Sequence, residues 1–127
     1  MKYNVTKGKN PTTKVDMYYA AIAPVNVITF ETLTEMISAE CTVTPHDTRA
    51  VLSALQEKII EQLMLGCSVR LGLLGSFRPT LNSVSAETKE EFTVSNIKRI
   101  NVVYTPSTTI KYKLSASNPN IHFEEMN

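Results

Sequence analysis

The sequence has few of the residues that build disulfide frameworks, phosphate loops or membrane spans. Its two cysteines, Cys41 and Cys67, have no CxxC or Cys/His spacing, which argues against a disulfide framework or zinc site and predicts reduced, buried thiols. Of the four glycines, Gly72 and Gly75 resemble no phosphate loop, because no Lys-Ser/Thr pair follows them. No segment approaches the roughly 18 apolar residues of a membrane span, and the N-terminal MKYNVTKGKN lacks an apolar signal region. We therefore expect a soluble, cytoplasmic protein.

The composition fits one ordered globular domain, and no group of residues indicates catalysis. The 127 residues, 43% hydrophobic and 20% charged, can bury a moderate core that a partner subunit could complete. His46 and His122 have no Ser, Cys or carboxylate at a catalytic spacing. We expect no enzymatic activity, no cofactor, no metal and no small-molecule substrate.

Charge is unevenly distributed, although the net charge is only +1. Residues 31–65 hold six acidic and two basic side chains, whereas residues 66–115 hold seven basic and three acidic ones, a net of +4. Basic charge therefore collects outside the helical region, although the net charge by itself is far from the basic excess of a dedicated nucleic-acid protein. The scattered lysines of residues 1–30 fit either an auxiliary basic surface or simple solubilisation, and solubilisation is favoured.

Hydrophobic periodicity predicts an N-terminal hairpin of two strands, followed by two helices. Residues 2–9 and 17–23 have strand character around a turn-forming segment, and the tyrosines there, Tyr3, Tyr18 and Tyr19, are expected in a core or interface more than stacked on bases. Residues 29–40 have the spacing of an amphipathic helix.

The second helix has the clearest start signal. Thr44 stands at the N-cap, Pro45 at the first helical position and Asp47 at the third, and Gly66 supplies the stop. Its apolar stripe is too wide for the short first helix to cover, so we expect a homodimer. The stripe consists of Val51, Leu52, Leu55, Ile59, Leu63 and Met64.

Strand character returns after the helices. A two-residue period begins at Val69, and a long polar hairpin is expected between about Pro79 and Asn101. A last helix is expected after Pro106, ending at Asn118-Pro119.

The order and spacing of these elements resemble the HU/IHF family of histone-like bacterial DNA-binding proteins. Residues 32–40 resemble the family's first helix, and residues 43–52 resemble its turn and second-helix start. Residues 66–77, GCSVRLGLLGSF, are similar to the signature Gly-x-x-Val-x-Leu-x-Gly-Phe-Gly-x-Phe, with leucines at the second Gly and first Phe. Residues 104–107, YTPS, resemble the Phe-x-Pro-Gly that opens the last helix.

The resemblance implies an α+β, HU/IHF-like fold. It consists of a helical dimerisation base and an antiparallel β-sheet with an extended β-ribbon arm, preceded here by an N-terminal β-hairpin. We expect a strand-rich extension at 1–28, an HU/IHF-like domain at 29–116 and a tail at 117–127. The extension is like that of a divergent HU-like subgroup of Bacteroidetes proteins. A bacterial, nucleoid-associated, cytoplasmic homodimer is implied, with double-stranded DNA as partner.

The expected arm departs from the family pattern at its tip. In the family, a proline at the tip wedges between base steps of the minor groove. Here no proline occurs between Pro79 and Pro106, and the tip at residues 86–91 is net acidic, which opposes binding to phosphates. Two functions therefore stay open, namely nonspecific DNA binding through backbone phosphates and an HU-like scaffold or protein-interaction module that has lost DNA binding.

The resemblance and the charge distribution together give the candidate DNA-contacting residues. The adjacent Lys98 and Arg99 fit a phosphate clamp and solvated edge charges equally well. The full set is Arg70, Arg78, Lys89, Lys98 and Arg99.

Overall fold

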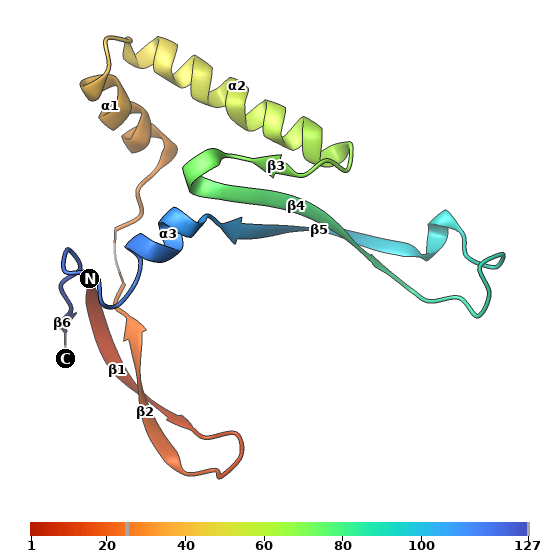
Figure 1. Cartoon of the computed structure of the whole chain (residues 1–127), viewed down its shortest axis with the longest axis horizontal. Coiled ribbons are helices and arrows are strands. Elements are labelled where there is room, and N and C mark those ends of the chain that lie inside the picture. Colours follow the sequence, from red (N-terminus) through yellow and green to blue (C-terminus); the bar gives the residue numbers. More distant parts are fainter. Residues whose placement is uncertain (25, 127) are drawn as a thin grey trace. The chain divides into compact units, whose positions relative to one another are not determined.

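A computed structural model describes residues 1–24 and 26–126 of the chain (Figure 1). Residues 25 and 127, which fall in the expected extension and tail, lie outside the described residues. The chain divides into two compact units, one built from Met1–Thr29 with Leu114–Asn127 and the other from Phe30–Lys113. Within the described part, no helix is both long enough and apolar enough to cross a membrane.

The first unit is a three-stranded sheet with the strand order β2-β1-β6. Strands β1 (Lys2–Lys9) and β2 (Asp16–Ile22) pair antiparallel in continuous register, and β6 (Glu124–Glu125) pairs parallel with the other edge of β1. The turn forms because the side-chain oxygen of Asn10 accepts from the N–H groups that follow, at 2.8 Å from Thr12 N. The predicted strands and turn are confirmed.

The second unit begins with two helices, α1 (Phe30–Glu40) and α2 (Pro45–Met64). The predicted cap of α2 is confirmed, because Thr44 Oγ1 accepts from the N–H of Asp47 at 3.2 Å and Pro45 is the first helical residue. The ion pair between Arg49 and Glu31 joins the two helices.

The rest of this unit is an antiparallel sheet with the strand order β3-β4-β5. It comprises β3 (Val69–Arg70), β4 (Gly75–Ser83) and β5 (Ile97–Pro106), and β4 and β5 form the long ribbon of Figure 1. Together with the helices, this sheet confirms the α+β class.

The last helix, α3 (Thr108–Lys113), is shorter than expected. The prediction that it ends at Asn118-Pro119 is wrong at that end, because Ser115 diverts the chain into a turn. The carbonyl of Ser115 accepts from Asn118 N at 3.0 Å, and its hydroxyl accepts from Ser117 N at 3.3 Å.

The described chain buries almost no apolar side chain by itself. Among the described residues, Ala23 is the only buried hydrophobic one. On α2, Val51 is 66% exposed and Leu55 is 44% exposed. Of the six predicted stripe residues, Val51, Leu55 and Met64 are thus exposed, and the other three are half-buried.

The single chain contradicts the predicted burial of the cysteines and the predicted core position of two tyrosines. Cys41 and Cys67 are both exposed, because they lie in the segments that follow α1 and α2 and not on the helical stripe. Tyr18 and Tyr19, expected in a core or interface, are 70% and 46% exposed, because β2 is an edge strand and its unit contains no helix among the described residues to cover it. They lie in no core of the single chain, and their place in an interface stays a prediction.

Two glycines, Gly72 and Gly75, flank the turn before β4, and the chain passes close to another strand at only one of them. Gly75 has φ 112°, and a Cβ there would lie 2.1 Å from the carbonyl oxygen of Thr105. Gly72 also has a positive φ, 56°, but a Cβ there would meet nothing within 4 Å. We predict that Gly75→Ala lowers the free energy of unfolding by about 3 kcal/mol or more and Gly72→Ala by about 1 kcal/mol. Thermal denaturation followed by circular dichroism measures both, and equal losses would contradict the close approach.

Candidate functional site

The register between β4 and β5 sorts the side chains of the ribbon onto two faces. Paired residues of antiparallel strands point to the same side, and the side alternates along each strand. One face carries Arg78, paired with Val103, and Arg99, paired with Asn82. The opposite face is apolar and comprises the pairs Phe77–Tyr104, Pro79–Val102 and Leu81–Ile100.

Strand β3 extends the same arrangement toward the body of the sheet. Arg70 pairs with Ser76, two residues before Arg78, so its side chain lies on the face of Arg78 and Arg99. Helix α2 contacts β3 and β4, and Val69 and Phe77 on the apolar face are half-buried, whereas the arginines are exposed. The structure therefore brings three of the predicted residues onto one exposed face, which we call the arginine face.

The arginine face is hollowed beside Arg70. The hollow has a volume of about 470 Å³, and Ser107 in its wall is fixed by two hydrogen bonds, donating to the Leu73 carbonyl and accepting from Ile110 N at 3.1 Å. A guanidinium with neighbouring hydroxyl and backbone groups is the donor set that contacts phosphate oxygens. The lining residues are Arg70, Gly72, Gly75, Ser76, Thr105, Pro106, Ser107 and Thr108.

Sequence reasoning missed the hydroxyl groups of this hollow. Ser76 and Thr105 are 29 positions apart in the chain and become neighbours only through the pairing of β4 with β5. The single signal in the sequence was the similarity of residues 104–107 to a family motif, which says nothing of what those residues face.

Lys98 is separated from its neighbour Arg99. The register shifts between Asn82, which pairs with Arg99, and Ser83, which pairs with Ile97, so Lys98 is the extra residue of a β-bulge. Its Nζ donates to the carbonyl of Ser95 at 2.8 Å. The amine therefore ties down the tip of the arm, and the two residues do not form an adjacent pair on the ribbon.

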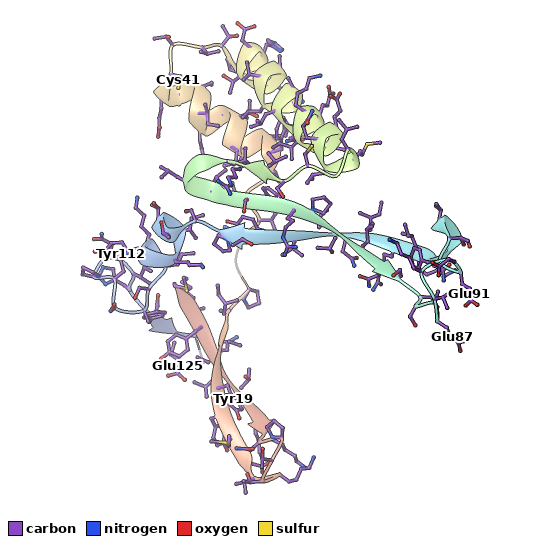
Figure 2. The ribbon with its side chains drawn as sticks, turned by 45° about the vertical axis from the view of Figure 1, so that its right-hand side comes forward. Tyr19, Cys41, Glu87, Glu91, Tyr112 and Glu125 are labelled. Carbon is purple, nitrogen blue, oxygen red and sulfur yellow. The ribbon has the colours of Figure 1, made fainter. Side chains whose placement is uncertain are left out.

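A folded turn closes the tip of the arm where the chain enters β5. Thr93 and Asn96 form a reciprocal capping box around the turn Val94–Asn96, and Asn96 Nδ2 donates to the carbonyl of Val84 at 3.2 Å. The remaining predicted residue, Lys89, is exposed in the loop beyond this turn. It stands among three exposed acidic residues, two of which, Glu87 and Glu91, Figure 2 shows at the end of the arm.

Two further features of the described residues add no second candidate site, namely the lysine-aspartate pair of the N-terminal hairpin and the residue types that bind metals. Lys7 of the N-terminal hairpin pairs with Asp16, 3.1 Å between Nζ and Oδ2. In residues 1–24 and 26–126, no three His, Cys, Asp or Glu side chains are placed to hold a metal ion.

The chain is similar to known proteins in its sequence and in its fold. Residues 1–120 match the HU-HIG family, described as an HU domain fused to wHTH, Ig, or Glycine-rich motif. No curated protein matches the chain.

A similar fold occurs in the crystal structure of a protein from Bacteroides vulgatus ATCC 8482, described as a “Putative bacterial DNA binding protein”. The match has a TM-score of 0.66 at 16% identity and covers 98% of this chain but 47% of that one, so the chain spans about half the length of that protein. The predicted HU-like fold and family resemblance are confirmed.

The capping box makes the arm tip testable by itself. We predict that Asn96→Ala speeds exchange of the Thr93 and Val84 amide protons about fivefold to tenfold, because it removes about 1 kcal/mol of hydrogen bonding that closes the turn. Hydrogen exchange followed by NMR measures this, with Asn101 in the ribbon as an internal reference. Ser95→Ala is the matched control, because the Ser95 hydroxyl contacts the Thr93 hydroxyl and leaves the Asn96 bonds in place. Unchanged exchange in Asn96→Ala would show that the box does not hold the tip.

Proposed function

Because this chain belongs to the HU-HIG family, we propose that it is a dimeric, histone-like protein that binds double-stranded DNA through backbone phosphates without sequence preference. The observation that carries the proposal is the arginine face, with Arg70, Arg78 and Arg99 on one exposed side of the β3-β4-β5 sheet. In this proposal, residues 29–116 form the HU-like domain, residues 1–28 an extension and residues 117–127 a tail. The protein acts in the cytoplasm, on the nucleoid, and not as an enzyme.

Guanidinium groups suit this task because each can donate two parallel hydrogen bonds to one phosphate. Asn82, the partner of Arg99, lies four residues beyond Arg78 on β4, which corresponds to about 13 Å along the ribbon. The two arginines are therefore far enough apart to contact different phosphates. Since none of these contacts reads a base edge, the binding carries no sequence information.

The arm tip argues against one part of the usual HU mechanism. The end of the arm has no proline, so the family's proline wedge is missing. Its three carboxylates, Glu87, Glu90 and Glu91, are repelled by phosphates. We therefore place the DNA contacts on the arginine face and the hollow beside Arg70, with Lys89 and Lys98 as secondary contacts.

The same tip supports one alternative function. A dimer that has lost its DNA contacts would serve as a scaffold or protein-interaction module, and its acidic arm ends would then face a protein. This alternative predicts that no duplex binds in a salt-dependent manner.

The proposed partner of the apolar stripe is a second copy of the chain. The faces of α1 and α2 meet in an apolar hollow of about 140 Å³, lined by Ile37, Val51 and Leu52 among others. Exposed stripes of this width on both helices match the large apolar interfaces of obligate dimers.

The arginine face is tested by measuring DNA affinity against salt. We predict that Arg78→Ala/Arg99→Ala weakens binding of a labelled random-sequence duplex at least tenfold at low salt, measured by fluorescence anisotropy. It should also reduce the slope of log affinity against log salt by about 3 to 4, because a dimer loses four phosphate contacts.

The matched control is Lys9→Ala/Lys14→Ala, which removes the same charge from the N-terminal hairpin. If both double variants weaken binding equally, only net charge matters and the arginine face is not the site. If the native protein binds no duplex even at low salt, the scaffold alternative replaces DNA binding.

The dimer is tested through the concentration dependence of stability. We predict that the native protein's Tm rises with protein concentration, and that Leu55→Glu abolishes the dimer in analytical ultracentrifugation and lowers Tm by more than 10 °C. Ala54→Glu adds the same charge one residue earlier, on the side of the helix that bears Glu57 and Glu61, and should leave the dimer intact. A native protein that sediments as a monomer would contradict the proposal.

A further inference from the structure

Strand β2 is an exposed edge without the usual protection. All seven of its residues are exposed, and its pairing with β1 runs unbroken from Tyr3–Ile22 to Lys9–Asp16. Natural edge strands commonly carry a proline, a lysine or a bulge that blocks pairing with another strand. The sequence DMYYAAI has no proline and no lysine, and its register with β1 has no bulge. Such an edge is built to receive a further strand.

The hydrogen bonds to β1 determine which backbone groups of β2 are available at this edge. Ala23 N donates to Lys2 O at 2.9 Å and Asn10 N donates to Val15 O at 3.0 Å. Both bonds join directly opposite residues of the two strands. Such hydrogen-bonded pairs alternate along an antiparallel ladder, so every second residue of β2 is bonded to β1. The alternate residues, Tyr18, Ala20 and Ile22, direct their N–H and C=O groups outward.

From this geometry we propose that β2 pairs antiparallel with β2 of a second copy, about a two-fold axis at Tyr19. In that register the outward groups of Tyr18 face those of the partner copy's residue 20, and all seven residues of each strand are paired. The two copies of Tyr19 meet in a non-hydrogen-bonded pair, where cross-strand aromatic contacts are closest.

Charge and shape both fit a second copy. Asp16 is the only charged residue of β2 and falls opposite residue 22 of the other copy, an isoleucine, so no like charges meet. Tyr18, the most exposed tyrosine of the strand, falls over Ala20, the smallest side chain on that face.

A hollow of about 450 Å³ adjoins this position, lined by Ala20, Ile22, Tyr3 and Phe123 among others. The rings of Tyr3 and Phe123 form its wall in an edge-to-face contact with centroids 6.5 Å apart. The ring of Tyr18 from the other copy fills this hollow, since it lies over Ala20 in the two-fold register. The strand is thus complementary to itself in charge, backbone phase and side-chain size, which selects a second copy over an unrelated strand.

Cysteine cross-linking tests the register directly. In a Cys41→Ser/Cys67→Ser background, which removes the exposed native thiols, Tyr19→Cys places two thiols across the axis at a Cα separation of about 4.5 Å, within disulfide reach. Tyr18→Cys is the matched control, because its two copies would lie about 8 to 9 Å apart, beyond the roughly 7 Å limit. We expect at least five times more disulfide-linked dimer from Tyr19→Cys than from Tyr18→Cys under mild oxidation.

A second variant tests the backbone contact without disturbing the hairpin itself. Ala20→Pro removes an outward N–H that β1 does not use, and added to the Tyr19→Cys protein it should lower the yield of linked dimer at least fivefold. The circular dichroism of the chain should stay unchanged. Equal cross-linking at positions 18 and 19, absence of a cross-link at 19, or insensitivity to Ala20→Pro would each overturn the proposal. A 19-to-19 cross-link is read out independently of DNA binding and of the helical dimer.

Discussion

The apolar surface of this chain exceeds what its own elements can cover, and the rest of the structure depends on that constraint. The helices α1 and α2 meet in a small apolar hollow, yet Val51, Leu55 and Met64 of the stripe stay exposed, and Ala23 is the only hydrophobic residue buried among those described. Hydrophobic burial is the main favourable term in folding. A single copy therefore has little of the free energy that would hold it together, and in the proposed assembly a second copy supplies it.

The alternation of side chains along β4 and β5 determines which residues share a face of the ribbon. It gives one ribbon an apolar side and an arginine side from the same stretch of sequence, so the apolar residues and the candidate binding residues are different ones. The bulge at Lys98 marks the end of this division. Beyond it, the side chains serve to close the tip, as the bond from Lys98 to Ser95 shows.

Local signals in the sequence predicted the elements, and nonlocal pairing determined the site. Thr44, Pro45 and Asp47 specify the start of α2 within four residues, so its cap could be foreseen. The shared face of Arg70 and Arg99 depends on the registers of two strand pairs, which no local pattern encodes. The exposure of Cys41 could not be foreseen either. A cysteine side chain can be buried, but its position after the end of a helix decides whether it is buried.

The closed tip of the arm changes the thermodynamics of any contact it makes. A disordered arm would lose conformational entropy when it settles on a partner, and that loss would subtract from the affinity. Here the capping box of Thr93 and Asn96 has already restricted the turn before a partner arrives. Association through this arm should therefore lack the large negative heat-capacity change that accompanies coupled folding and binding.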